Sequence, residues 1–105
     1  MSESKLKVSE EKILNLEDVF KALASSRRLK ILAFLSKDED ACAKQIAEEL
    51  ELSQPDISYH LSLLCRNGIV GKRKEGTKNC YYLNRQRLET FGIYPESFLL
   101  GGETT

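Results

Sequence analysis

Apolar residues recur every three or four positions through the first two thirds of the chain, which is the spacing of α-helices. One such stripe predicts a helix from about Glu10 to Ala24, with apolar positions at Ile13, Leu16, Val19, Phe20 and Leu23. Leu14 lies off this stripe, so the helix has apolar residues on more than one side. In so small a protein, extra apolar surface is often covered by a second subunit, although a wide core stripe gives the same pattern.

Two further helices follow in the apolar pattern. Ser25 and Ser26 interrupt the first stripe and can cap a second helix from Arg27 to Ser36. The acidic residues 37–41 read as a loop, and a third helix is predicted from about Ala43 to Leu50. Residues 1–9 are polar and are predicted to form a flexible N-terminal segment.

The most clearly marked helix lies within Leu52 to Gly68. Ser53 is a good N-cap, Pro55 occupies the first turn, and Gly68 ends the helix. Its apolar stripe is Ile57, Leu61 and Leu64. The opposite face and its flank carry amide, hydroxyl, phenol and guanidinium groups, which suit contact with base edges, at Gln54, Pro55, Ser58, Tyr59, Ser62 and Arg66.

After Gly68 the pattern changes to that of a β-hairpin. Residues 69–74 and 80–83 suggest two strands, residues 75–78 suggest the turn between them, and a short helix is predicted from Arg85 to Phe91. A helix, a turn of about three residues, a polar-faced helix and a basic hairpin form a winged helix-turn-helix. The predicted fold is therefore mainly α with a small hairpin, in the order α-α-α-α-β-β-α. It covers residues 10–92, and residues 93–105 form a C-terminal tail.

Composition and charge refine this picture. The chain has 105 residues, 41% apolar and 30% charged, which fits one soluble domain. Its formal net charge is zero, but residues 38–64 carry −6 and residues 65–88 carry +6. Because the local field steers a polyanion, this basic block favours nucleic-acid binding. The predicted backbone contacts are Lys44, Lys72, Arg73, Lys74 and Lys78.

No arrangement of residues points to an enzyme or a membrane protein. No histidine is paired with a nucleophile, and there is no glycine-rich phosphate loop. The N-terminus has no signal-peptide core, which suggests a cytoplasmic protein without membrane contact. His60 is the only histidine, and packing within the core is its expected role.

The three cysteines, Cys42, Cys65 and Cys80, fit neither a disulfide framework nor a zinc finger by their spacing. Packing is the default role of Cys65 and Cys80, and Cys42 can be an incidental thiol. The alternative is that the fold gathers all three into a sensor of soft metal, arsenite or oxidant.

Three stretches resemble the ArsR family of winged-helix transcriptional repressors. They are FKALASSRRLKILAFL (20–35), LSQPDISYHLSLLCRNGIV (52–70) and KRKEGTKNCYYLN (72–84). The resemblance implies a homodimer that binds a pseudo-palindromic double-stranded DNA operator, with one recognition helix in each major groove. It also implies that the first and last helices pack between subunits, and the dimerisation residues expected there are Ile13, Leu14, Leu16, Phe20, Leu88 and Phe91.

The family's metal sites are not preserved in this chain. Where one branch has an ELCVCDL-like motif, residues 40–46 read DACAKQI, so Cys42 remains and Lys44 stands at the second thiol position. Another branch uses Asp and His ligands in the last helix, where this chain has no histidine. We therefore predict neither metal nor cofactor. The alternatives to a DNA-binding repressor are a winged-helix protein-interaction module and a thiol-gated repressor.

Overall fold

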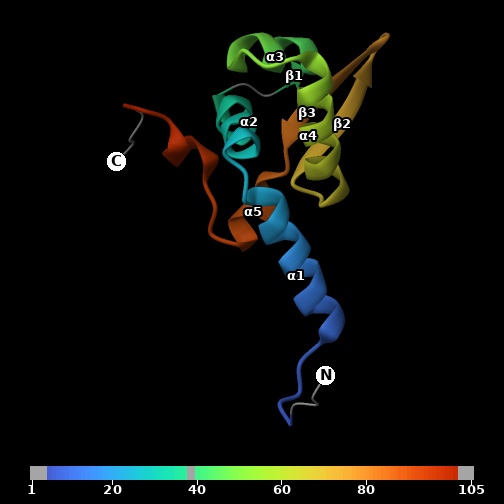
Figure 1. Ribbon diagram of the computed structural model, residues 1–105, viewed down its shortest axis with the longest axis vertical. Helices are drawn as coiled ribbons and strands as arrows, with labels where there is room; N and C mark the ends of the chain where they lie inside the picture. Colours follow the sequence, from blue (N-terminus) through green and yellow to red (C-terminus); the bar gives the residue numbers. More distant parts are fainter. Residues whose placement is uncertain (1–4, 38–39, 102–105) are drawn as a thin grey trace.

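A computed structural model describes residues 5–37 and 40–101 and has the predicted winged helix-turn-helix architecture (Figure 1). It is mainly helical, with one small antiparallel sheet. The elements are α1 (Glu10–Leu23), α2 (Ser26–Lys37), β1 (Ala41–Cys42), α3 (Ala43–Leu50), α4 (Gln54–Arg66), β2 (Val70–Glu75), β3 (Lys78–Leu83), α5 (Arg85–Thr90) and the 3-10 helix η1 (Pro95–Phe98).

The sheet has three strands where the sequence predicted two. Residues 37–41 were expected to be a loop, but Ala41 and Cys42 form β1, which pairs with Tyr81 and Cys80 of β3. The strand order is β1-β3-β2, so β3 is central. A two-residue strand is too short to show alternation, which is why the sequence pattern does not reveal it.

The wing turn lies at residues 75–78, as the sequence predicted. Glu75 pairs with Lys78, so Gly76 and Thr77 are the two central residues of the turn. Gly76 has φ 66°, as the first central position of a type II′ hairpin turn requires. Tyr82 on β3 lies directly over Gly71 on β2, where the Cβ of any larger residue would come within 2.3 Å of the Tyr82 ring.

The core lies between the helix-turn-helix and the sheet. Most of its fully buried side chains come from α2, α3, α4 and the residue before β2, with one each from α1 and α5; they include Ile31, Leu32, Leu35, Ile46, Ile57, Leu61, Leu64, Ile69, Val19 and Leu88. Burying each such side chain contributes about 1.5–3 kcal/mol, which holds α4 firmly on its apolar stripe. The predicted stripe of α4 is therefore confirmed as its inner face.

The ends of α4 are fixed by the residues that the sequence indicated. Ser53 Oγ accepts a hydrogen bond of 3.1 Å from the backbone N–H of Asp56. At the other end Gly68 has φ 72°, and the N–H of Ile69 donates to the carbonyl of Leu64 at 3.0 Å. This bond closes a Schellman-type end, so α4 begins and ends at defined positions.

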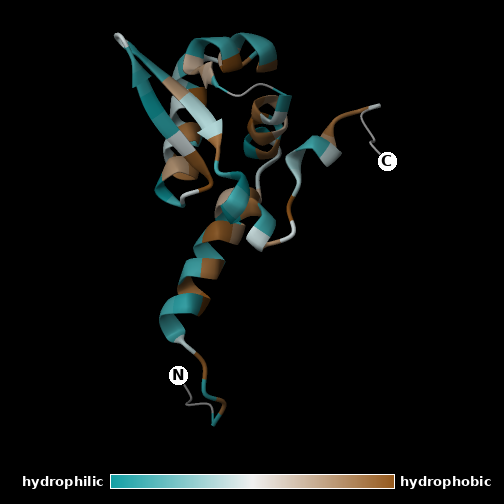
Figure 2. Cartoon of the chain, turned by 180° about the vertical axis from the view of Figure 1, so that it is seen from behind, coloured by the Kyte–Doolittle hydropathy of each residue, from teal (hydrophilic) through white to brown (hydrophobic). Residues whose placement is uncertain are grey.

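Helix α1 projects from the body of the protein (Figure 1). Only Val19, Ala22 and Leu23, near its C-terminal end, are buried, and residues 10–18 are all exposed. Apolar and hydrophilic residues alternate along this projecting part (Figure 2). The first half of α1 thus presents apolar side chains that this chain does not cover.

The C-terminal part of the chain returns to the body. Leu88 of α5 is 1% exposed and belongs to the subunit's own core. The expectation that Leu88 faces a second subunit is therefore wrong, because no surface of this side chain remains to be covered. Within the predicted tail, η1 packs on α2 with Pro95 buried, whereas Leu100 is fully exposed. Residues 1–4 of the predicted flexible segment and 102–105 of the tail lie outside the described residues.

Candidate nucleic-acid interface

The polar face of α4 is exposed, as the helical periodicity predicted. All six predicted contact residues have high solvent exposure, and Tyr59 is 60% exposed despite its size. They are Gln54, Pro55, Ser58, Tyr59, Ser62 and Arg66. Because the opposite face of α4 is locked into the core, this face can enter a groove without unfolding the helix.

Two contacts restrain the side chains on this face. Ser62 Oγ donates a hydrogen bond to the carbonyl of Tyr59 at 2.8 Å, which leaves its lone pairs available as acceptors. The Tyr59 ring meets the His60 ring edge-on, with 5.3 Å between ring centroids. Tyr59 is thereby supported at its base while most of the ring stays in solvent.

His60 joins α4 to the rest of the fold through Arg28, which the sequence pattern did not single out. Arg28 Nη1 lies 3.0 Å from His60 Nδ1, and Arg28 Nε donates to the carbonyl of Ala22 at 2.6 Å. A third bond of 3.4 Å runs from Nη2 to the carbonyl of Lys21. One guanidinium on α2 therefore connects the end of α1 to the recognition helix.

A sequence signal for Arg28 existed. Arg27 and Arg28 lie in the first turn of α2, which contains no acidic residue. Cations there oppose the positive end of the helix dipole, so they point to compensation by some other contact. For Arg28 the compensating contacts are its hydrogen bonds to the carbonyl groups at the end of α1.

Arg28 also fixes the protonation state of His60. A guanidinium only donates, so Nδ1 must accept and the ring is neutral. Burial lowers the pKa of His60 below its ordinary value of 6.5, and the charges of Arg28 and then Arg27 lower it further, against the opposing effect of Asp56. His60 is 9% exposed, which confirms the predicted packing role, although its partner is a side chain.

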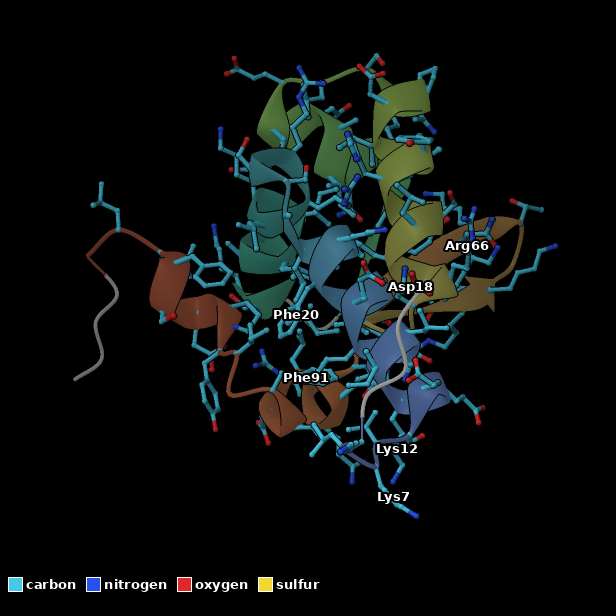
Figure 3. The ribbon with its side chains drawn as sticks, turned by 60° about the horizontal axis from the view of Figure 1, so that its bottom comes forward. Lys7, Lys12, Asp18, Phe20, Arg66 and Phe91 are labelled. Atoms are coloured by element: carbon cyan, nitrogen blue, oxygen red, sulfur yellow. The ribbon has the colours of Figure 1, made fainter. Side chains whose placement is uncertain are left out.

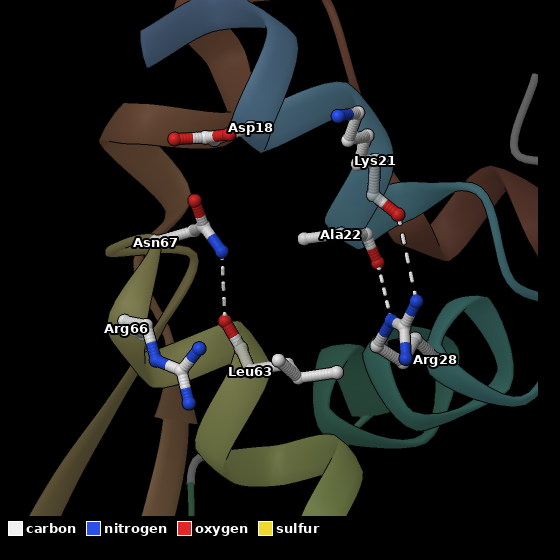
Figure 4. A pocket seen from close by; sticks show the side chains of 7 residues that line it. All are labelled: Asp18, Lys21, Ala22, Arg28, Leu63, Arg66 and Asn67. Carbon is white, nitrogen blue, oxygen red and sulfur yellow. Dashed lines mark hydrogen bonds between the residues drawn. The ribbon is translucent and has the colours of Figure 1, made fainter. Parts of the chain in front are cut away.

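A cavity of about 290 Å³ lies next to this contact, between the end of α1, the start of α2 and the end of α4 (Figure 4). Its lining residues are Asp18, Lys21, Ala22, Arg28, Leu63, Arg66 and Asn67. Figure 4 shows Arg28 reaching across to the carbonyl groups of α1 on one side, with Arg66 on the other. The cavity separates the predicted dimer helix from the C-terminal end of the recognition helix.

The cations of the wing are divided between two faces of the sheet. Lys72 pairs with Tyr81 and Lys74 with Asn79, so both lysines lie on the side of β2 that faces α4 and the core. Arg73 lies on the other side. There it forms ion pairs with Asp40 and, at 3.4 Å, with Glu75, and its guanidinium lies 5.7 Å from the Tyr82 ring centroid. Two carboxylates therefore engage Arg73 in the free protein, and its contact with DNA stays a prediction.

The remaining predicted cations are exposed. Lys78 is at the wing turn, opposite Glu75, and Lys44 is in the first turn of α3. Neither forms an ion pair among those found in the described residues. Among the described residues, exposed cations outside these ion pairs therefore include Arg66 on α4 and lysines at the first turn of α3, on β2 and at the wing turn.

The three cysteines do not gather into one site, which corrects that alternative. Cys42 and Cys80 are cross-strand partners on one face of the sheet, whereas Cys65 of α4 packs against the core on the other. Burial raises the pKa of the Cys65 thiol, and the positive charge of Lys72 partly opposes this shift. Burial also raises the pKa of Tyr81, with a smaller contribution from Cys65. Among the described residues, no group of three or more His, Cys, Asp or Glu side chains could hold a metal ion.

The predicted dimerisation residues on α1 are exposed. Ile13, Leu14 and Phe20 are 49%, 57% and 51% exposed, and Leu16 is also exposed. Phe20 lies against Phe91, which directly follows α5, with 6.2 Å between ring centroids (Figure 3). The exposed apolar side chains of α1 therefore continue onto the half-buried Phe91, which caps the end of α5.

Comparison with known proteins decides what this arrangement is. The family model described as bacterial regulatory protein, arsR family, matches residues 25–72, from the end of the α1–α2 turn into β2. An arsenical resistance operon repressor from Staphylococcus aureus is 40% identical over 74 residues, which cover 70% of each chain. The chain belongs to the arsR family of bacterial regulatory proteins.

Two further proteins match a larger share of this chain. An uncharacterised HTH-type transcriptional regulator from Methanocaldococcus jannaschii is 42% identical over 79 residues, which cover 75% of this chain and 89% of that one. A solution structure of a homodimeric winged helix-turn-helix DNA-binding domain from Mycobacterium bovis matches with a TM-score of 0.71 and 27% identity, covering 84% of this chain and 82% of that one. The predicted family and fold are thus confirmed.

Membership of the arsR family places the chain among transcriptional regulators rather than enzymes, as the sequence indicated. No helix in the described part of the chain combines the length and apolarity that crossing a bilayer requires.

Proposed function

We propose that this arsR-family regulator is a cytoplasmic repressor that binds a pseudo-palindromic site in double-stranded DNA as a homodimer. Helix α4 enters the major groove of each half-site, and Gln54, Ser58 and Tyr59 read base edges. Arg66, Lys44 and the wing lysines contact phosphates. The observation that carries the proposal is the exposed polar face of α4, which the turn after α3 presents beside a basic wing.

The dimer rests on a separate observation. The first half of helix α1 carries apolar side chains that are exposed to solvent in the single chain, at Ile13, Leu14 and Leu16. Pairing this helix with its copy, together with Phe91, removes that apolar area from water. Two-fold symmetry then presents two copies of α4 on one side of the dimer, which a palindromic operator matches.

A mobility shift with the duplex upstream of the protein's own gene tests the proposal at two salt concentrations. The proposal predicts a specific complex that survives competitor DNA, and an affinity that falls steeply as salt screens the phosphates. A scrambled duplex of equal composition is the control. Specific binding equal to that of the scrambled duplex at low salt would contradict it.

A winged-helix protein-interaction module is the second candidate, and the charge distribution favours it. Residues 38–64 carry −6, Asp56 lies in the first turn of α4, and Arg73 is engaged by Asp40 and Glu75. These charges reduce the attraction to phosphates. Loss of specific DNA binding in the experiment above, with an intact dimer, is the outcome that favours this candidate.

A further inference from the structure

The sheet sets two cysteines directly opposite each other. Cys42 of β1 and Cys80 of β3 are paired positions in an antiparallel ladder, so their side chains project to the same face. Both residues are partly exposed, and both are free thiols. We propose that Cys42 and Cys80 form an intrasubunit disulfide when the protein meets a hydroperoxide, and that this pair is a reversible oxidation site.

The hydrogen-bond pattern of the sheet makes this pair a close one. Glu75 and Lys78 close a two-residue turn and so form a hydrogen-bonded pair. Hydrogen-bonded and non-hydrogen-bonded pairs alternate along an antiparallel ladder. Lys74 and Asn79 therefore form a non-hydrogen-bonded pair, and Arg73 and Cys80 form the next hydrogen-bonded pair. The backbone groups of Cys80 therefore point toward β2. On its other side, facing β1, the pair with Cys42 must be of the non-hydrogen-bonded type.

The backbone of Cys42 supports the same assignment independently. Its N–H donates to Gln45 Oε1 at 2.9 Å, at the start of α3, instead of serving the ladder. Non-hydrogen-bonded pairs have Cα atoms about 4.5 Å apart, with their side chains closer than in the other type. That separation falls within the Cα range of about 4.4–6.8 Å seen in disulfides, so the bond needs little movement of the backbone.

The third cysteine is excluded from this site by the fold. Cys65 lies on α4, on the core side of the sheet, and burial raises the pKa of its thiol. A thiol with a raised pKa forms less of the reactive thiolate, and Cys65 lies on the face of the sheet opposite Cys42 and Cys80. Asp40, next to Cys42 in the chain, forms an ion pair with Arg73, the β2 partner of Cys80, so charged side chains flank the two cysteines.

A hydroperoxide is the only co-reactant that disulfide formation between Cys42 and Cys80 requires. One cysteine thiolate attacks a peroxide oxygen, the O–O bond breaks, and an alcohol or water leaves with a proton while the sulfur becomes a sulfenic acid. The second thiolate attacks that sulfur, the S–O bond breaks, and hydroxide leaves and is protonated to water. Two thiols are oxidised by two electrons and one hydroperoxide is reduced. A small thiol such as dithiothreitol reverses the reaction.

Peptide mapping of the full-length protein after hydrogen peroxide treatment tests the proposal. Under non-reducing conditions we expect tryptic peptide 38–44 linked to peptide 79–85, with the loss of two hydrogens and release by dithiothreitol. The same linked pair should form in Cys65→Ser and vanish in both Cys42→Ser and Cys80→Ser. A dominant link to peptide 45–66, a link between subunits, or oxidation of isolated cysteines without a link would overturn the proposal.

A second measurement tests whether the bond fits the native sheet. Linking Cys42 to Cys80 closes a loop in the unfolded chain without distorting the folded one, so oxidised protein should melt at a higher temperature than reduced protein. Cys80→Ser should show no difference between the two conditions. A lower midpoint for the oxidised wild type would overturn the claim that the bond fits the sheet. Neither measurement involves DNA, so each stands apart from the proposed regulatory function.

Discussion

Arg28 on α2 and His60 on the recognition helix are held 3.0 Å apart, with the guanidinium donating to Nδ1 of the imidazole. The same guanidinium holds the last carbonyl groups of α1 at Ala22 and Lys21. This single side chain therefore fixes the position of α4 relative to the predicted dimer helix. The spacing between the two recognition helices of a dimer depends on that relationship, because it sets how α4 leaves the subunit interface.

Replacing Arg28 tests this connection. Arg28→Ala removes three hydrogen bonds from a charged donor and leaves the Nδ1 of a buried histidine unpaired, so we expect a loss of about 2–3 kcal/mol in the free energy of unfolding. Arg28→Lys keeps the charge but cannot reproduce the forked geometry, and should recover only a small part of the loss. Urea denaturation measures both. Wild-type stability in Arg28→Ala would show that this side chain holds nothing in place.

The protonation of His60 predicts a pH dependence of stability. The unfolded chain binds the imidazole proton more tightly than the folded one, because folding lowers the pKa of His60. The stabilisation from neutral His60 is therefore complete above the unfolded pKa of 6.5 and is lost as pH falls below it. Thermal melts from about pH 8 to about pH 5 measure the effect. His60→Asn retains an acceptor near the Nδ1 position but does not titrate, so its stability should fall less with acidification.

Two variants that add the same negative charge at different positions of α1 test whether its apolar stripe forms the dimer surface. Ile13→Glu places a carboxylate on the exposed apolar stripe that leads to Phe20 and Phe91. Each subunit then loses about 1.5–3 kcal/mol of apolar burial, so the dimer Kd should rise at least about a hundredfold. Asn15→Glu adds the same charge elsewhere on the exposed half of α1 and should leave the dimer intact. Sedimentation equilibrium that shows both variants equally dimeric would exclude this surface.

The two faces of the wing predict different effects of its cations. Lys72→Ala and Lys74→Ala each remove one phosphate partner per subunit of a homodimer, so each should lower the log–log salt slope of DNA affinity by roughly 1.8. Arg73→Ala should change the slope much less, because Arg73 is already neutralised by Asp40 and Glu75. Fluorescence anisotropy over a salt series measures the slopes. An effect of Arg73→Ala equal to that of the lysines would mean that DNA displaces its carboxylate partners.

The fold was largely predictable because four helices repeat their apolar spacing over several turns, and their caps, such as Ser53, are specific. The features that the sequence did not reveal depend on contacts between distant residues. Pairing with β3 creates strand β1, and the ion pair of Arg73 with Asp40 joins residues far apart in the chain. Helix α5 has six residues, too few for periodicity to show that Leu88 points inward. Pattern alone could not place Cys42 opposite Cys80.

The exposed face of the recognition helix is central to the proposed function, and the ratio of specific to non-specific DNA affinity tests it most directly. The ratio is measured with a duplex that the wild-type protein selects from a random library, and with a scrambled duplex. Substituting Ser58 and Tyr59 together by alanine should lower specific affinity by about 1–3 kcal/mol for each base that is no longer read. Non-specific affinity, the dimer and the thermal melt should stay unchanged, so the ratio collapses. An unchanged ratio in the double variant would contradict the claim that α4 reads the operator.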